Sequence, residues 1–253
     1  MGIDIVTFRH LLRVADDLGP GKRALVLGRQ HFLKRPLTAR MERQLPVYQS
    51  LIDMSGREMK VEALIDDDGF SDSVFKSLGF AQTDYMDISD YEGANVLHDL
   101  NQPVPEHMWE RYDFILDGGT IEHIFNVPEA FKNVDRMLRP DGRFLALNPA
   151  NNWLGHGFYQ FGPEIVWSFW RDMMGYEVIT CGISAMRDFY GKHTVYPGPP
   201  EDRDGARDHA IRKMGGDAIR LLVYDVRKGQ GAQSDAVQQS DYVKTWSEGG
   251  EPP

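Results

Sequence analysis

Two histidines close to acidic and aromatic residues are the side chains of this sequence best suited to chemistry. His123 follows Glu122 at the end of the string Asp-Gly-Gly-Thr-Ile-Glu-His, and His156 lies in the string Asn-Asn-Trp-Leu-Gly-His-Gly-Phe-Tyr. Histidine changes its charge near neutral pH, so it can accept a proton from an oxygen or a nitrogen atom. Tyr159 could orient the group that loses the proton. We therefore predict His123, His156 and Tyr159 as catalytic residues, with His123 ranked first. The alternative for each histidine is a structural ring that only bonds a backbone carbonyl.

A strand, a helix and a second strand are predicted around His123. Tyr112 to Leu116 is a short apolar run, typical of a strand that is buried on both faces. Asn126 opens a segment with helical apolar spacing, and Glu129 stands three residues later, as in a capping box. The helix should end before Arg-Pro-Asp-Gly, and a second apolar run covers Phe144 to Leu147. Such a βαβ unit forms parallel sheet, whose ligands bind beyond the carboxyl ends of the strands. The residues expected at this rim are Asp117, Gly118, Gly119, Glu122 and His123.

This unit carries a resemblance to a known family. The strings Asp117 to His123 and Leu138 to Phe144 resemble the second half of the class I S-adenosylmethionine (SAM) dependent methyltransferase domain. The resemblance extends over about Lys22 to Lys228 and is strongest between Asp84 and Asn152. It implies an α/β, Rossmann-like fold, with a mostly parallel seven-stranded sheet, helices on both faces and an antiparallel last strand. It also implies SAM as the cofactor and S-adenosyl-L-homocysteine (SAH) as its product.

The loop after the first strand departs from the family pattern. A helix is predicted from Ile5 to Leu18, and Arg23 to Gly28 then forms the central strand. The family follows this strand with a GxGxG turn, because glycines let the backbone approach the methionine part of SAM. Here only Gly28 is kept, and Arg29 and Gln30 follow it. The chain therefore has either a variant loop in which Arg29 or Gln30 contacts the cofactor, or a methyltransferase scaffold that has lost SAM.

Acidic residues at successive strand ends are the other part of the implied cofactor site. The resemblance assigns the ribose hydroxyls to Asp87, with Asp84 and Asp90 as alternatives if the strand register differs. It assigns the adenine ring to Asp99 and to the Leu100 N–H. For any single acid, a solvated loop residue is the alternative. The complete predicted set of cofactor-binding residues is Gly28, Arg29, Gln30, Asp87, Asp99, Leu100, Asp117 and Gly118.

The sequence predicts one domain with an insertion. Residues 1–228 form the methyltransferase-like domain, and residues 229–253 are too polar for a core and are expected to be a disordered tail. From Gly28 to the next strand near Thr83 is over fifty residues, more than the about 30 of a βαβ unit. A helical insertion at about 33–70 is therefore predicted. It could cover the cofactor, form a dimer surface or serve only as scaffold.

A metal site is not predicted. Cys181 is the only cysteine, which excludes an internal disulfide and a cysteine-built zinc site. Some members of the resembled family that methylate ribose or catechol-like oxygens place a divalent metal on an acidic residue three positions before a Glu-His pair. This chain has Gly119 there. Glu122, His123 and His156 could still form a partial site of the histidine and carboxylate type.

Composition and the remaining strings limit the kind of substrate. The net charge of −10 argues against a nucleic-acid surface, and the basic string from Lys34 to Arg43 is interpreted as a solvated helix face. No run of 18 apolar residues and no targeting signal is seen, so a cytoplasmic protein without membrane contact is expected. The string from Asn148 to Pro163 is rich in glycine and aromatic residues, and predicts a loop that stacks on a flat substrate. It also resembles a group of uncharacterised bacterial methyltransferase-like proteins. Finally, Tyr176 to Ile183 and Leu221 to Val226 are predicted as the antiparallel hairpin that closes the sheet.

The sequence thus predicts a biosynthetic, SAM-dependent O- or N-methyltransferase that acts on a small molecule or a sugar. The alternative is a non-catalytic protein of the same fold that binds a nucleotide-like ligand or a protein partner. A protein side chain as the methyl acceptor and a homodimer are further open alternatives.

Overall fold

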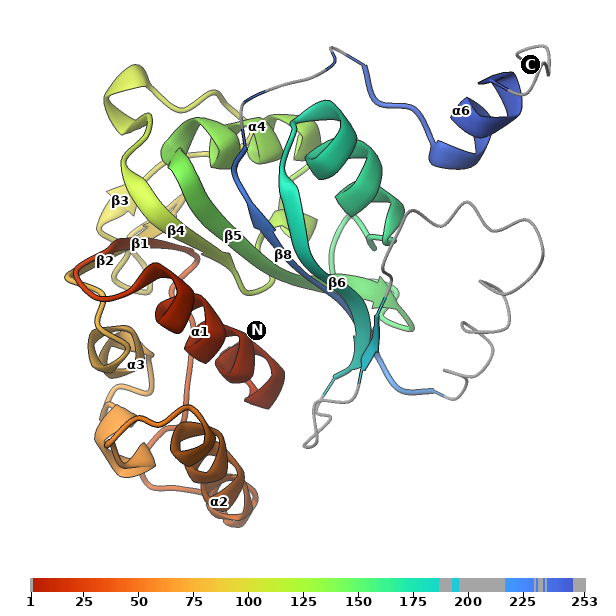
Figure 1. Ribbon diagram of the computed structural model, residues 1–253. Helices are drawn as coiled ribbons and strands as arrows, with labels where there is room; N and C mark the ends of the chain where they lie inside the picture. Colours follow the sequence, from red (N-terminus) through yellow and green to blue (C-terminus); the bar gives the residue numbers. More distant parts are fainter. Residues whose placement is uncertain are drawn as a thin grey trace.

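The structure, a computed structural model, describes residues 2–186, 193–195, 217–229, 231, 234 and 236–247. Within these residues one sheet has the strand order β3-β2-β1-β4-β5-β8-β6-β7 (Figure 1). The strands are β1 (Arg23–Leu27), β2 (Gln82–Asp87), β3 (Val96–Leu97), β4 (Tyr112–Asp117), β5 (Leu138–Asn151), β6 (Glu177–Ala185), β7 (His193–Val195) and β8 (Arg220–Arg227).

Pairing divides the sheet into a parallel part and an antiparallel part. β1 pairs in parallel with β2 and with β4, and β3 and β5 extend this part at either side. β8 is inserted between β5 and β6 and is antiparallel to both. The predicted Rossmann-like class I methyltransferase fold and its hairpin are confirmed. The sheet differs from the predicted seven strands by β7, a short strand at the edge that is antiparallel to β6.

The described helices cover both faces of this sheet. The longer segments are α1 (Ile5–Leu18), α2 (Ala39–Met54), α3 (Asp72–Ser77), α4 (Val127–Met137), the π-helical η4 (Ile165–Met173) and α6 (Ser240–Ser247); the short turns are η1 (Val61–Leu64), η2 (Glu106–Met108) and η3 (Ile121–His123). One apolar core joins α4 and η4 to the sheet, and the other joins α1, α2 and α3 to its opposite face (Figure 1). Successive strand residues point to opposite faces, so Ile115 belongs to the first core, and Phe114 and Leu116 to the second.

The predicted insertion contains helical structure that packs on α1. α2 ends at Met54, and Gly56 follows with a φ of 72°. Tyr48 on α2 makes an edge-on contact with Phe8 on α1, with 5.3 Å between the ring centres. In the described residues, no helix has both the length and the apolar character that crossing a bilayer needs.

Two local predictions differ from the structure. The predicted capping box does not form, because the Asn126 side chain donates to the carbonyl of Asn101 while Glu129 pairs with Arg136. The segment predicted as a disordered tail contains α6, although residues 248–253 lie outside the described part. The Ser240 hydroxyl at the start of α6 donates to Glu164 at 2.9 Å, so this helix is anchored to the domain by a polar contact, which composition does not reveal.

The strand register sets the position of the rim. Leu27 in β1 lies opposite Met86 in β2 and opposite Asp117 in β4. The three strands therefore end together, and the residues that follow them lie along one edge of the sheet, as is usual for ligand sites of open parallel sheets.

Candidate active site

A cavity of about 440 Å³ lies at this rim. Its walls come from the segments that follow β1, β2, β3 and β4. The predicted site residues that line it are Gly28, Arg29, Gln30, Asp87, Asp99, Leu100 and His123. The predicted residues that do not line it are Asp117, Gly118, His156 and Tyr159.

Gly28 is required by the turn after β1. Its φ is 66°, and its N–H donates to the Met86 carbonyl at 2.8 Å. A Cβ atom at this position would lie 2.9 Å from Oγ1 of Thr120, which itself donates to the Leu27 carbonyl at 2.7 Å. Only glycine adopts this conformation without steric cost, so the one glycine kept from the family pattern has a clear structural role.

Gln30 fills the space beside this turn. Its side chain is buried, and Nε2 donates to the carbonyls of Leu27 and Gly28, both at 3.2 Å. A Cβ atom on Gly118 would lie 2.6 Å from Cδ of Gln30. Gly118 therefore allows close packing of Gln30 and does not line the cavity, contrary to the prediction for it. Oε1 of Gln30 has no hydrogen-bond partner within the described residues.

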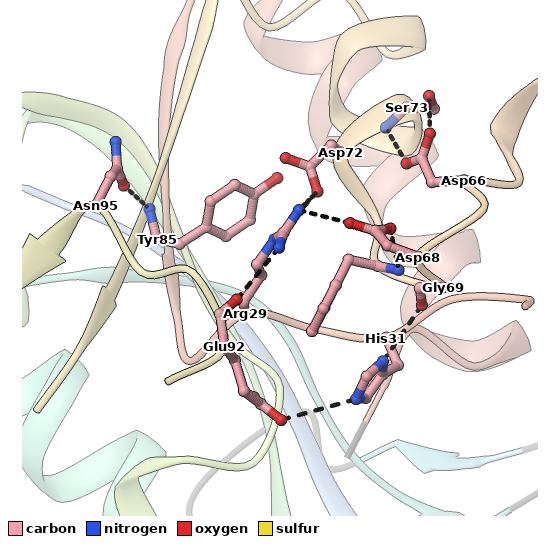
Figure 2. Close-up of polar contacts among 11 residues, drawn as sticks. Arg29, His31, Asp66, Asp68, Gly69, Asp72, Ser73, Tyr85, Glu92 and Asn95 are labelled. Carbon is pink, nitrogen blue, oxygen red and sulfur yellow. Dashed lines mark hydrogen bonds and ion pairs between the residues drawn. The ribbon is translucent and has the colours of Figure 1, made fainter. Parts of the chain in front are cut away.

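Arg29 is held by acidic residues instead of facing a ligand. Figure 2 shows its guanidinium beside Asp72 and Asp68, which accept hydrogen bonds at 2.8 Å and 3.1 Å. The same group donates to the Glu92 carbonyl at 3.2 Å and lies over the Phe70 ring at 4.1 Å. Arg29 thus ties the loop after β1 to the segment before α3 and to the loop after β2. The predicted contact of its guanidinium with the cofactor is not supported.

His31 is a cavity residue to which the sequence analysis gave no role. Its Nδ1 lies 3.3 Å from the Gly69 carbonyl, and its Nε2 lies 3.9 Å from Oε1 of Glu92 (Figure 2). It also lines a second cavity of about 280 Å³ next to α1 and α2, together with Gly118. Its position four residues beyond the end of β1 could have indicated this place in the sequence.

Asp87 and Asp99 present carboxylate oxygens to the cavity. Asp87 accepts from the Ile88 N–H at 2.6 Å, and Asp99 accepts from the N–H and the side chain of Asn101. These bonds from Asn101 lower the pKa of Asp99. Within the described residues, Oδ2 of each aspartate accepts no hydrogen bond, and the Leu100 N–H has no acceptor. Three residues that line the cavity therefore keep hydrogen-bonding groups that other described residues do not use.

The two register alternatives for Asp87 do not line this cavity. Asp84 is buried and accepts hydrogen bonds from Arg23, Asn95 and Tyr112. Asp90 is exposed and is not among the lining residues.

Asp117 has an internal role, which corrects the prediction of a cofactor contact. It is fully buried, and its Oδ1 accepts from the N–H groups of Gly119 and Thr120 at 3.1 Å and 2.7 Å. Its Oδ2 accepts from Nδ2 of Asn148 at 2.7 Å. Burial raises its pKa. Because both oxygens are used inside the protein, Asp117 shapes the turn after β4 and cannot reach a ligand.

Glu122 forms a second buried acidic position beside both histidines. It is fully buried, and burial, followed by the charge of Asp117, raises its pKa to about 8. Oε2 accepts from Nδ2 of Asn148 at 3.1 Å. Oε1 lies 3.5 Å from Nε2 of His156 and 3.9 Å from Nε2 of His123. Burial lowers the pKa of both histidines. The structure therefore brings together the two histidines predicted from sequence, with Glu122 as the group that joins them.

The predicted substrate loop is docked on Glu122 through its backbone. The Glu122 carbonyl accepts from the N–H groups of Phe158 and Tyr159, and a Cβ atom on Gly157 would lie 2.7 Å from this carbonyl. The Tyr159 hydroxyl donates to the Phe125 carbonyl at 2.8 Å. Tyr159 thus holds the loop in place, and its predicted role in orienting an acceptor is not supported.

Comparisons with known proteins were made by sequence and by structure. No protein-family model and no curated protein matches the chain. Among solved structures, it is similar to TehB from Haemophilus influenzae (13% identity, TM-score 0.42, 87% of this chain and 61% of TehB). It is also similar to the N-methyltransferase NodS from Bradyrhizobium japonicum in complex with SAH (12%, 0.41, 87% and 85%) and to a SAM-dependent methyltransferase from Archaeoglobus fulgidus (11%, 0.43, 88% and 93%). Because these identities and TM-scores are low, the fold assignment rests on the strand order of the sheet.

Proposed function

We propose that the protein is a SAM-dependent methyltransferase that acts on an oxygen or nitrogen atom of a small molecule or a sugar. One observation carries this proposal. Asp87, Asp99 and Leu100 line one cavity at neighbouring strand ends, beside the Gly28 turn, and within the described residues Oδ2 of each aspartate and the Leu100 N–H have no hydrogen-bond partner. Such a set matches a nucleoside, which offers ribose hydroxyls, an amino group and ring nitrogens. A cytoplasmic, biosynthetic role belongs to the same proposal.

Each of these groups has one partner on the cofactor. Asp87 would accept from the ribose hydroxyls, Asp99 from the adenine amino group, and the Leu100 N–H would donate to an adenine ring nitrogen. Oε1 of Gln30, which has no hydrogen-bond partner among the described residues, would accept from the ammonium group of the methionine part. Gln30 thereby takes over part of the function of the missing glycines.

Methyl transfer would take place at the end of the cavity where His123 lies. The carbon–sulfur bond of the sulfonium would break, its electron pair would return to sulfur, and a carbon–oxygen or carbon–nitrogen bond would form while the acceptor gives its proton to His123. Exposed apolar side chains lie two residues from each histidine in the sequence: Phe125 is 69% exposed, Phe158 65% and Leu154 90%. They offer a surface for a flat, partly apolar acceptor.

The second candidate function is binding without catalysis. Its support is the loop after β1, where Arg29 is bonded to Asp68 and Asp72 and the GxGxG pattern is absent. In that case the cavity would hold a nucleotide-like ligand and transfer no methyl group.

Calorimetry with SAH tests the proposal. We expect micromolar binding to the wild-type protein, and an affinity about 10–100-fold weaker in Asp87→Ala and in Asp99→Ala, because each variant loses a charge-assisted hydrogen bond. Asp90→Ala is the matched control, since Asp90 is exposed and does not line the cavity. Absence of SAH binding to the wild type would remove SAM from the account. Binding without turnover in a screen of acceptors with a labelled methyl donor would favour the second function.

A further inference from the structure

Glu122, His123 and His156 place three potential metal ligands around one point. Oε1 of the glutamate and one ring nitrogen of each histidine all lie within 4.8 Å of one another. We propose that these three side chains bind one divalent transition-metal ion such as Zn²⁺, with a coordination position left open for the hydroxyl oxygen of the methyl acceptor. The proposed binding of the ion depends only on these three residues. The role of the open coordination position rests on the proposed methyl transfer.

Two of the three ligand atoms are buried and unsatisfied. Among the residues that the structure describes, Oε1 of Glu122 and Nε2 of His156 have no hydrogen-bond partner. Buried polar atoms in folded proteins are nearly always hydrogen-bonded, so a pair of unsatisfied atoms 3.5 Å apart calls for an explanation. An ion between them would satisfy both, and its charge would compensate the carboxylate of the fully buried Glu122.

Neighbouring side chains orient Glu122 and His156, as the residues around metal ligands do in known metal sites. Asn148 donates to Oε2 of Glu122 at 3.1 Å, which leaves Oε1 for the ion. The Trp153 ring stacks on the His156 ring, with 3.6 Å between the centres and 10° between the planes. Both contacts fix the direction in which a ligand atom points, an arrangement that raises metal affinity.

The donor set selects the class of ion. Two imidazoles and one carboxylate suit zinc or iron(II), whereas magnesium and calcium prefer oxygen ligands. Ligand atoms on a tetrahedral zinc ion, with bonds of about 2.0–2.1 Å, lie about 3.3 Å apart. The Glu122–His156 distance of 3.5 Å is already close to this value. The ring of His123, 3.9 Å from Glu122, has to move nearer, and its side chain is 46% exposed and has room to do so.

The place of this site defines what the ion would do. His123 lines the cofactor cavity, so the open position would face the methyl group. An ion at this position would lower the pKa of a bound hydroxyl, so that the hydroxyl gives its proton to solvent water and an oxygen nucleophile forms near neutral pH. The two histidines would then act as ligands and not as the proton acceptors predicted from sequence. The methyl acceptor would then be a molecule that carries a hydroxyl group.

Zinc titration of tag-free, chelator-treated protein tests the site. We expect one Zn²⁺ per chain by equilibrium dialysis, and at least 100-fold weaker binding in His156→Ala and Glu122→Gln. Co²⁺ should give the visible absorption of a four- or five-coordinate ion in the wild type only. His107→Ala is the matched control, because His107 is exposed on η2. Circular dichroism checks that each variant folds. If His156→Ala or Glu122→Gln does not fold, His123→Ala takes its place, because the His123 side chain is half-exposed.

Two results would overturn the site: no zinc binding by the folded wild type, or stoichiometric binding that all three ligand variants retain. SAH calorimetry on the same preparations separates this site from the proposed function. Zinc binding without SAH binding would support the metal site and contradict the proposed methyl transfer. SAH binding without zinc binding would contradict the metal site and leave the proposed methyl transfer in place.

Discussion

Acidic residues in two halves of the same sheet edge differ in burial and in the hydrogen bonds that they make. At the end of β2 and after β3, Asp87 and Asp99 are half-buried and line the cavity, and one oxygen of each accepts no hydrogen bond from the described residues. After β4, Asp117 and Glu122 are fully buried, and Asn148 bonds to both. Position at a strand end is therefore not enough to assign a ligand contact. The bonds that a carboxylate already makes inside the protein decide whether it can bind a ligand.

The largest expected effect is on stability, in Asp117→Ala. The variant leaves the N–H groups of Gly119 and Thr120 and the Asn148 side chain without their acceptor. We expect the free energy of unfolding in urea to fall by about 3–5 kcal/mol. Asp87→Ala should change it by less than about 0.5 kcal/mol, as surface substitutions usually do. Equal losses in the two variants would contradict the division of the edge into two halves.

The next effect is on cofactor affinity, in Gly28→Ala. A left-handed conformation costs an L-residue about 1–2 kcal/mol, and the new Cβ would meet Oγ1 of Thr120 at 2.9 Å. SAH affinity should fall about tenfold or more. Gly155→Ala is the matched control, because Gly155 has a φ of 79° and no atom of the described part of the chain lies within 4 Å of the added Cβ. It carries the same backbone strain away from the cavity. Equal SAH affinity in the two variants would show that the Gly28 turn does not support the cofactor.

A smaller effect with a defined pH dependence is expected in Asp84→Asn. Burial alone would raise the pKa of Asp84, but hydrogen bonds from Arg23, Asn95, Gln82 and Tyr112 outweigh it and lower the pKa below 3.8. The charged carboxylate thus stabilises the fold above the unfolded pKa, and this contribution is lost as the pH falls through the folded pKa. The variant should be about 1–2 kcal/mol less stable at pH 7. The difference should shrink below about pH 4 in urea denaturation. A difference that stays constant from pH 7 to pH 3 would contradict a structural role of the charge.

The smallest effect is expected in Tyr159→Phe. The variant loses one hydrogen bond to the Phe125 carbonyl, worth about 0.5–1.5 kcal/mol. The methyl-transfer rate should fall by less than about tenfold. A loss of 100-fold or more, with SAH affinity unchanged, would restore the predicted role of Tyr159 in orienting the acceptor.

The sequence predicted the elements that depend on local spacing. α1 spans Ile5–Leu18 as predicted, because its apolar residues recur at helical spacing and Gly19 ends it with a φ of 73°. The family resemblance and the rule that ligand residues follow parallel strands pointed to Asp87 and Asp99, and both line the cavity. Their contact with a cofactor stays a prediction.

The parts that depend on contacts between distant segments could not be predicted. Asp117 turns inward because the turn that follows directs its N–H groups back to the carboxylate. The guanidinium of Arg29 points to Asp68 and Asp72, which only the docking of the insertion brings near. His156 reaches Glu122 because Phe158 and Tyr159, which follow it in the chain, donate backbone hydrogen bonds to the Glu122 carbonyl. None of these contacts leaves a periodic pattern in the sequence.

A crystal structure with bound SAH tests the central claim most directly. The account predicts ribose hydroxyls within hydrogen-bond distance of Asp87, and the adenine between Asp99 and the Leu100 N–H. An adenosine bound elsewhere, with Asp87 and Asp99 still in contact only with solvent, would contradict it.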